Sequence, residues 1–401
     1  MDHRIPGGMM EHGPILCLVG WWPEPGSVAG IFILEHLQAI ARHRAVEVVY
    51  TTVEKSHRPV PTITIRTGIE AGLTVHRIQI RTPIRRYGVP TILVRMAYKR
   101  LLRRVPKPAL VHIHVRTDET ACGTGIARAL GVPVVVTEHN SFYHLGIRAL
   151  PPKAQATERA RIARWFADPV IARVMPVSKD LARVLVNDHG VREDLVTVIP
   201  NVAADVFHAG PPPPPGPFRM LLAAVWRPPK DHDVFIRAMR ELPDTVRRSC
   251  IVEWAGYGPD MATIVQRCAA ELPDVDIRFP GLLSKSEMAD AMRQAHLFIL
   301  PTMADNLPCV VLESHCCGTP VLSMRVNGLP ELIDDTNGVL IPPSSPQALA
   351  KALEELMTGK HRFDRQTIAN TARQRYAASA VGARIDQVYR EVLGVKADEL
   401  G

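Results

Sequence analysis

The sequence lacks the features that mark membrane spans, disulfide frameworks and nucleic-acid readers. Its 401 residues contain no apolar run approaching the ~18 residues that a membrane-spanning helix needs. Seven cysteines without CxxC spacing form neither a zinc knuckle nor a recognisable disulfide frame, which fits a reducing compartment. Aromatic residues make up only 5% of the chain and no binding motif is present, so we expect no nucleic-acid partner.

The N-terminus, "MDHRIPGGMMEHGPILCLVGWW", also lacks the pattern of a secretory signal. It begins with mixed charges, and its apolar stretch runs only from Ile15 to Val19, which is typical of a first β-strand. Hydrophobic residues make up 46% and charged residues 22%, as in ordinary globular domains. We therefore expect a cytoplasmic protein of two or more domains.

Acidic residues are absent from one long basic stretch. Residues 81–107 contain nine Lys or Arg and no Asp or Glu, within a net charge of +8. Between Thr91 and Arg104 the apolar residues recur at roughly helical spacing; they are Ile92, Leu93, Met96 and Leu101. One interpretation is a helix attracted to an anionic surface, either the inner face of the membrane or a phosphorylated acceptor. The other is the solvated face of an ordinary helix.

What the sequence does contain is a regular alternation of strands and helices. Short Val- and Ile-rich runs are "PILCLVG", "AVEVVYTTV", "ALVHIHV", "VPVVVTEH", "VMPVS" and "LVTVIPN", and helical stretches separate most of them. This alternation is the signature of parallel βαβ units. It stops at the Pro-rich segment 206–217 and then restarts with "FRMLLAAVW".

The pattern predicts an α/β protein of two doubly wound, Rossmann-like domains. We assign residues 1–205 to the first domain, 206–217 to a stiff linker and 218–374 to the second domain. A C-terminal helix within about 375–401 is expected to cross back to the first domain. Ligands of such sheets bind beyond the carboxyl ends of the strands, so a cleft between the domains is the expected site.

Five segments in a fixed order resemble one known family. They are "WWPEPGSVAGIFILEHLQAIARH", "PVVVTEHNSF", "VIPNVAADVF", "AVWRPPKDHDVFIRAM" and "PTMADNLPCVVLESHCCGTPVL" followed by "VNGLPELI" and "NGVLIPP". In this order they resemble the group 1 family of retaining GT-B glycosyltransferases, family 4. The last segment is the most specific, because an acid, seven residues, Glu and a Gly-x-Pro-Val strand resemble the donor-binding signature.

The resemblance implies roles for individual residues. It implies that the catalytic residues are His139, Arg227, Lys230 and Asp305. It also implies that the residues that bind the donor or its nucleotide are Gly30, Gly256, Tyr257, Leu283, Asn306, Leu307, Cys309, Val310 and Glu313. Asp305 stands where the family usually has Glu, and Pro308 cannot donate an N–H to a phosphate. Gly30 has a second interpretation as a plain helix-entry glycine, and His112 and His114 are interpreted as core-edge residues.

The chemistry of nucleotide-sugar transfer explains these residue types. The departing diphosphate carries extra negative charge, which Arg227, Lys230 and the N-terminus of a following helix can neutralise without a metal. "DHD" (231–233) and "DVD" (274–276) look like metal-binding motifs, but helix capping and a turn explain them better. We therefore expect no metal and no cofactor, with a nucleotide-sugar, most often a UDP-sugar, as co-substrate.

Asp305 and Glu313 are too far apart for a hydrolytic pair. If all eight intervening steps were helical, about 12 Å would separate them, whereas glycosidase pairs need ~5–9.5 Å. By resemblance, Asp305 accepts from donor-sugar hydroxyls and Glu313 holds the ribose. The alternative makes Glu313 a partner of a buried Arg and Asp305 a helix cap.

The resulting hypothesis is a retaining, metal-independent glycosyltransferase acting in polysaccharide, glycolipid or natural-product glycoside biosynthesis. Its rivals are a nucleotide-sugar epimerase or polymer synthase on the same fold, and a non-catalytic nucleotide-sugar-binding protein. The acceptor, a sugar or glycoside that is either lipid-linked or soluble, would meet loops near residues 22–30, 56–70 and 81–95. Neither those loops nor the rest of the sequence indicates the acceptor or the oligomeric state.

Overall fold

The chain folds into two compact α/β units. In the computed structural model, residues 13–24, 27–84 and 89–395 are described. The first unit comprises residues 1–200 and 381–401, and the second comprises residues 201–380. Among the described residues, no helix combines the length and apolar character that crossing a membrane requires.

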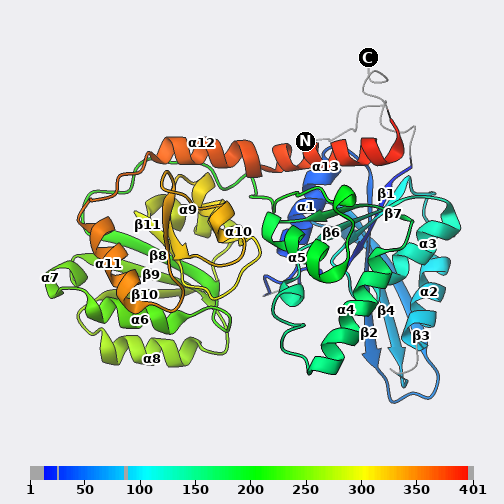
Figure 1. The fold of residues 1–401 in the computed structure, drawn as a ribbon, viewed down its shortest axis with the longest axis horizontal. Helices are drawn as coiled ribbons and strands as arrows, with labels where there is room; N and C mark the ends of the chain where they lie inside the picture. The colour runs from blue at the N-terminus through cyan, green and yellow to red at the C-terminus, as the bar shows by residue number, and fades with distance from the viewer. Residues whose placement is uncertain (1–12, 25–26, 85–88, 396–401) are drawn as a thin grey trace. The chain divides into compact units, whose positions relative to one another are not determined.

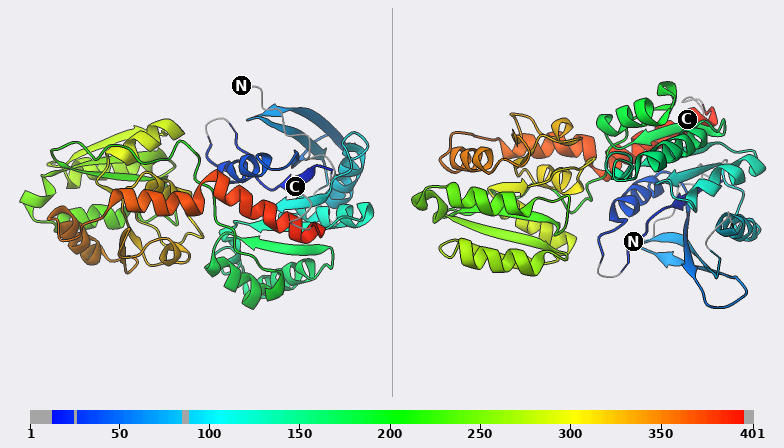
Figure 2. Two further views of the ribbon diagram at one scale, coloured as in Figure 1. Left: turned by 90° about the horizontal axis from the view of Figure 1, so that it is seen from above. Right: turned by 60° about the horizontal axis from the view of Figure 1, so that its bottom comes forward.

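The first unit is built on a seven-stranded sheet with the order β3-β4-β2-β1-β5-β6-β7. All neighbours are parallel except the antiparallel pair β3 and β4. The strands are β1 (Ile15–Val19), β2 (Val46–Lys55), β3 (Thr62–Glu70), β4 (Leu73–Thr82), β5 (Leu110–His114), β6 (Val134–Glu138) and β7 (Ile171–Pro176). β1, β5 and β6 are buried along their whole length, whereas the longer β2, β3 and β4 extend beyond them (Figures 1 and 2).

The helices of this unit follow the strands as βαβ crossovers require. They are α1 (Ile31–Ala41), α2 (Val89–Leu101), α3 (Gly123–Leu130), α4 (Pro152–Phe166) and α5 (Lys179–His189), with α13 (Ala378–Leu393) returning from residue 381 onward. Ser178 caps α5 by accepting from the Leu181 N–H at 3.0 Å, as its position before the helix predicts. α13 packs against the end of α1, where a Cβ at Gly382 would lie 2.6 Å from the Ala39 carbonyl oxygen, and its Asp386 pairs with Arg44 just after α1.

The second unit is an all-parallel sheet of six strands with the order β10-β9-β8-β11-β12-β13. Its strands are β8 (Phe218–Val225), β9 (Cys250–Tyr257), β10 (Asp276–Gly281), β11 (Leu297–Leu300), β12 (Val321–Met324) and β13 (Gly338–Ile341). Chain order runs outward from β8 to β10 and then resumes at β11 on the other side of β8. The topological switch point of this sheet therefore lies between β8 and β11.

Helices cover both faces of the second sheet (Figure 1). They are α6 (His232–Glu241), α7 (Asp244–Arg247), α8 (Met261–Glu271), α9 (Lys285–Gln294), α10 (Cys309–Cys316), α11 (Pro346–Met357) and α12 (Arg365–Tyr376). α6, α8 and α11 lie on one face, and α9, α10 and α12 lie on the other. A core centred on Trp226, Trp254 and Phe235 fills the space between the first group and the sheet.

The structure corrects two local predictions and shows which side of α2 is buried. "LVTVIPN" forms no named strand and pairs only through an isolated bridge from Val196 to Val174. Most of the predicted acceptor loop 56–70 is strand β3. In α2 the buried side chains are Val94, Ala97, Tyr98 and Leu101, whereas Ile92 and Met96 are exposed.

Candidate functional site

Two loops meet at the switch point of the second sheet. The first, Trp226–Lys230, follows β8, and the second, residues 301–308, follows β11. Their backbones are joined where the Asp231 N–H donates to the Pro301 carbonyl at 3.0 Å and the Met303 N–H donates to the Pro229 carbonyl at 2.8 Å. The predicted phosphate loop and the donor signature therefore form one continuous surface at the carboxyl ends of β8 and β11.

An ion pair joins the two loops through their side chains. Lys230 Nζ lies 2.5 Å from Asp305 Oδ2, and both side chains are largely shielded, at 16% and 23% exposure. Arg227 precedes them on the same loop and is exposed. It makes no side-chain hydrogen bond or ion pair within the described part of the chain. Arg227 can therefore contact an anion without giving up a partner. Lys230 must either leave Asp305 or contact the anion while it remains paired with Asp305.

The "DNLP" segment is held firmly against its own unit. Asn201 Nδ2 donates to the Leu307 carbonyl at 2.7 Å, and the Asp305 N–H donates to Asn327 Oδ1 at 3.3 Å. Asn306 and Leu307 are buried. α10 begins directly after Pro308, so its positive dipole end lies at Cys309 and Val310.

The segment between Asp305 and Glu313 is only partly helical. Residues 305–308 are bends and irregular backbone, and only the steps from Cys309 to Glu313 are helical. Asp305 therefore belongs to the loop after β11, whereas Glu313 lies in α10 with 7% exposure. The two acids are on different elements, as two separate contacts to one ligand would require.

The loop Gly256–Gly258 ("GYG") is hydrogen-bonded to the loop Trp226–Lys230, the predicted phosphate loop. The Trp226 N–H donates to the Tyr257 carbonyl at 2.8 Å, and the Asp260 N–H donates to the Trp226 carbonyl at 3.1 Å. Gly256 has a φ of 125°, and a Cβ there would lie 2.0 Å from the Ala224 carbonyl oxygen. This close approach explains the glycine without a ligand, while half-buried Tyr257 stands at the end of β9. Leu283, also half-buried, follows β10, the strand beyond β9.

The acids of both metal-like motifs, residues 231–233 and 274–276, already have other partners. Asp231 caps α6 by accepting from the Val234 N–H at 3.2 Å, which confirms the capping interpretation. Asp233 pairs with Arg237 and with Arg267. In the second motif, Asp274 accepts from Arg247 and Arg248, and these guanidinium groups hold its pKa at about 2. Asp276 opens β10 and pairs with Arg278.

The first unit has its own switch point, between β1 and β5. Gly30 is the N-cap of α1, with φ at 80°, and a Cβ there would lie 2.9 Å from the Trp22 nitrogen. The helix-entry interpretation of Gly30 therefore has a structural basis. His139 follows β6 and is 9% exposed. Its ring centroid lies 4.7 Å from that of Phe32 and 5.0 Å from that of His36.

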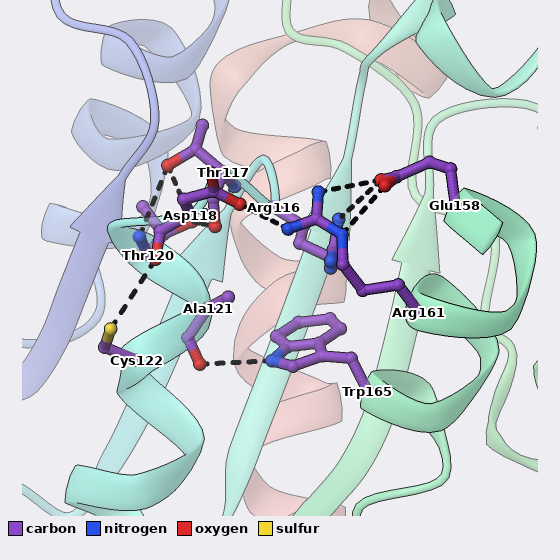
Figure 3. Close-up of polar contacts among 9 residues, drawn as sticks. All are labelled: Arg116, Thr117, Asp118, Thr120, Ala121, Cys122, Glu158, Arg161 and Trp165. Carbon is purple, nitrogen blue, oxygen red and sulfur yellow. Dashed lines mark hydrogen bonds and ion pairs between the residues drawn. The ribbon is translucent and has the colours of Figure 1, made fainter. Parts of the chain in front are cut away.

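The loop after β5 is braced by α4 (Figure 3). Arg161 Nη1 donates to Asp118 Oδ1 at 2.6 Å and its Nε donates to Glu158 at 2.8 Å. Trp165 Nε1 donates to the Ala121 carbonyl at 3.1 Å. The contacts to Asp118 and Ala121 tie this loop to α4 beside the carboxyl end of β5.

Several buried polar groups near this edge were missed by sequence reasoning. Glu138 Oε1 accepts from the Arg116 N–H and from Tyr143 Oη, both at 2.8 Å, and burial raises the Glu138 pKa to about 7. His114, predicted to lie at the core edge, is fully buried, as is His36 on α1. The available signal was a charged or imidazole side chain within otherwise apolar strand or helix patterns.

Two family models match the chain. The model described as "Glycosyltransferase Family 4" matches residues 29–203, and the model described as "Glycosyl transferases group 1" matches residues 205–375. Together they span most of both units. The resemblance that the sequence motifs indicate is therefore confirmed.

Curated relatives include several proteins named D-inositol 3-phosphate glycosyltransferase. The one from Mycobacteroides abscessus is 28% identical over 386 residues, covering 89% of this chain and 84% of the relative. The one from Thermobispora bispora is 29% identical over 289 residues, covering 66% of each. The match to a third, from Catenulispora acidiphila, spans 58% of that relative's length.

Solved structures share the fold at low sequence identity. Anabaena Alr3699/HepE in complex with UDP has a TM-score of 0.71 at 16% identity, covering 94% of this chain and 100% of that chain. Sucrose-phosphate synthase (tll1590) from Thermosynechococcus elongatus has a TM-score of 0.70 at 17% identity, covering 96% and 100%. The predicted class, two Rossmann-like parallel-sheet domains, is confirmed.

Proposed function

Because the chain belongs to family 4 of the glycosyltransferases, described as glycosyl transferases group 1, we propose that it transfers a sugar from a nucleoside diphosphate to an acceptor hydroxyl. The observation that carries this proposal is that the loop holding Arg227 and Lys230 is hydrogen-bonded to the loop leading into α10, at the point where the sheet reverses its strand order. Fixed cations and a helix dipole at one point are what a departing diphosphate requires.

Each group of this surface has one task in the proposed reaction. Arg227 offers a planar fork to two phosphate oxygens, and Lys230 offers a point charge. Asp305 accepts from a hydroxyl of the donor sugar once Lys230 turns from it to the phosphate. Glu313 holds the ribose, and His139 donates to the donor sugar. The acids of both DxD-like motifs already have caps or arginine partners, which supports transfer without a metal. Retention of configuration is proposed from the family resemblance alone.

UDP is the proposed nucleotide, supported by the UDP named for the Anabaena neighbour. A phosphorylated cyclitol is the acceptor class to test first, because the curated relatives are named for D-inositol 3-phosphate. The deciding experiment is calorimetric titration of wild type with UDP, GDP and ADP, each with and without Mg²⁺. The proposal expects one nucleotide to bind with equal affinity in both conditions.

Glu313→Ala and the matched variant Glu354→Ala complete this experiment. Glu354 is an exposed residue of α11 in the same unit, so its substitution should leave nucleotide affinity unchanged. Glu313→Ala should weaken it by about 10–100-fold, the equivalent of one or two hydrogen bonds to a charged group. Thermal melting of both variants checks that the second unit stays folded. Binding of no nucleotide by wild type would end the transferase proposal.

Donor hydrolysis separates an enzyme from a binding protein of the same fold. A transferase releases some sugar to water when no acceptor is present, and Arg227→Ala should reduce that release. A non-catalytic nucleotide-sugar-binding protein would release none in either form. Product analysis with UDP-sugar alone also detects an epimerase, because the sugar would change while it stays on the nucleotide.

α2 supplies the proposed contact with an anionic membrane surface. Ile92 and Met96 are 58% and 57% exposed, and Arg95, Lys99 and Arg100 are exposed on the same helix. Two apolar side chains among cations are typical of helices that lie on anionic membranes. Vesicle sedimentation tests this: wild type should bind anionic but not zwitterionic vesicles, and Ile92→Ser/Met96→Ser should lose binding at low salt. If wild type and variant bind the vesicles equally, Ile92 and Met96 are solvent-exposed side chains that do not contact a membrane.

A further inference from the structure

Three histidines from three elements of the first unit converge in its interior. His36 lies on α1, His114 ends β5 and His139 follows β6. Each offers one ring nitrogen, and these three atoms all lie within 4.8 Å of one another. The ring centroids are 5.0 Å apart for His36 and His139, 6.0 Å for His36 and His114, and 6.2 Å for His114 and His139.

Two of these imidazoles are fully buried with unused nitrogens. Neither ring nitrogen of His36 or of His114 makes a hydrogen bond of normal geometry to any described residue. The Pro200 carbonyl lies close enough to raise the His36 pKa slightly, against the larger lowering effect of burial. Buried polar nitrogens without partners cost free energy, and native interiors rarely leave them so. Apart from the approach of the Pro200 carbonyl to His36, nothing in the described part of the chain satisfies these nitrogens, and this calls for an explanation.

The neighbouring His112 shows what a satisfied histidine looks like in the same core. Its Nδ1 lies 2.7 Å from Tyr389 Oη and its Nε2 lies 2.7 Å from Thr137 Oγ1. Its ring centroid is 3.9 Å from that of His114, so it packs against that ring and fixes its place. Both nitrogens of His112 are therefore already hydrogen-bonded. This argues against the other possible group of metal ligands, which consists of Cys17, His112 and His114. Cys17 is also a poor ligand, because burial raises its pKa and keeps it a thiol.

We propose that His36, His114 and His139 form a binding site for a transition-metal ion of the Zn²⁺ class. Three imidazoles without a carboxylate suit Zn²⁺, Co²⁺, Ni²⁺ or Cu²⁺ and are a poor set for Mg²⁺, Ca²⁺ or Mn²⁺. Three His ligands leave the fourth tetrahedral position open to water or a ligand. Such an ion is chemically distinct from the Mg²⁺-type ion that the proposed transfer reaction does without.

The geometry needs only a small contraction. Ligand nitrogens at ~2.0–2.1 Å from a tetrahedral Zn²⁺ stand about 3.3 Å apart, so pairs now within 4.8 Å must approach somewhat. His139 can supply this movement, because it lies beyond the end of β6 and is the most exposed of the three.

Metal binding at this site would compete with the proposed transfer reaction. The same imidazole of His139 is assigned to the donor sugar there, so a bound ion should inhibit transfer. The metal site itself is inferred from the geometry of the first unit and does not depend on the proposed function. Its test can therefore be made without any nucleotide-sugar.

The experiment uses the full chain after dialysis against EDTA. Co²⁺ is titrated by its visible absorption, which is intense for tetrahedral nitrogen coordination, and Zn²⁺ by calorimetry and by displacement of Co²⁺. Wild type should bind one equivalent. His36→Gln, His114→Gln and His139→Gln should each weaken binding by at least the roughly 10–100-fold that loss of an outer-shell partner costs. Of the three variants, His139→Gln should disturb folding least, because the His139 ring lies at the edge of the core.

His57→Gln is the control, because His57 is an exposed histidine of the same unit and should change nothing. Absence of the cobalt spectrum in wild type would overturn the proposal. So would a site whose affinity His139→Gln leaves unchanged, since the ion would then be held by surface histidines. Loss of transferase activity without any effect on cobalt binding concerns the proposed function alone.

Discussion

Lys230 and Asp305 are partners in the structure, at 2.5 Å between Nζ and Oδ2, although the proposed reaction assigns them to different parts of one ligand. Lys230 would contact the phosphate, and Asp305 would contact the sugar. The pair keeps two largely shielded charges compensated while the site holds no donor. Binding must therefore exchange one charge partner for another, which makes the response to free UDP differ from the response to UDP-sugar.

Asp305→Asn should strengthen binding of free UDP. Without its carboxylate partner, Lys230 is available to the diphosphate, and a repulsive charge near the phosphate is gone. We expect a gain of about 2–5-fold, the equivalent of a partly exposed ion pair, together with loss of transfer from UDP-sugar. Calorimetry with UDP and a product assay with UDP-sugar measure the two effects.

Asp276→Asn is the matched control for that gain. Asp276 is an acid paired with arginine at the amino-terminal end of β10, which is the opposite edge of the sheet from the candidate site. UDP affinity should not change in this variant. If Asp305→Asn weakens UDP binding, Lys230 does not move to the diphosphate.

Arg227→Ala should weaken UDP by about 10–100-fold, as expected when a hydrogen-bonded charged contact is lost. Uridine has no phosphate, so its affinity should be the same in variant and wild type. Arg237→Ala removes an exposed arginine of α6 and should leave both affinities unchanged. Parallel losses for UDP and uridine would indicate a damaged fold or a contact to the nucleoside, contrary to the proposed role.

The architecture could be predicted because its causes are local. Val- and Ile-rich runs alternate with helical stretches, so each βαβ unit is marked in the sequence itself. Caps are equally local: Ser178 and Asp231 precede helices and accept from the N–H three residues on. The loops after β8 and β11 were recognised by motif, and the switch point that joins them follows from strand order.

Pairings between distant elements could not be predicted in this way. Lys230 meets Asp305 only because β11 returns to the free side of β8. α2 shows a second limit: Ile92 and Met96 are as apolar as buried Val94, and only packing against the rest of the unit decides which side is covered. The same holds for His36 and His114, whose proximity depends on where α1 crosses the sheet.

Gly256→Ala should destabilise the second unit and disturb the candidate site. Its φ of 125° disfavours any side chain, and a Cβ would lie 2.0 Å from the Ala224 carbonyl oxygen. We expect a loss of roughly 2 kcal/mol or more in the free energy of unfolding. Gly125→Ala is the contrast, because a Cβ at this position in α3 meets nothing within 4 Å. It should stabilise by about 0.5–1 kcal/mol. Chemical denaturation of both variants measures the difference, and equal effects would refute the steric argument.

His315→Gln should reduce the acid sensitivity of the second unit. His315 lies in α10 and its side chain is buried. Burial lowers its pKa to about 4. Smaller effects of the Asn337 carbonyl and Asp334 raise the pKa, and that of Arg375 lowers it. The unfolded chain binds the proton near pH 6.5, so below that pH protonation favours unfolding. Wild type should therefore lose up to about 3 kcal/mol between pH 6.5 and 4 through this group, with no further loss below. The stability difference between wild type and variant, followed by urea denaturation across this range, should change by that amount. His208→Gln removes an exposed histidine of the same unit and should retain the wild-type pH dependence. A wild-type slope in His315→Gln would mean that the acid sensitivity arises from other buried groups.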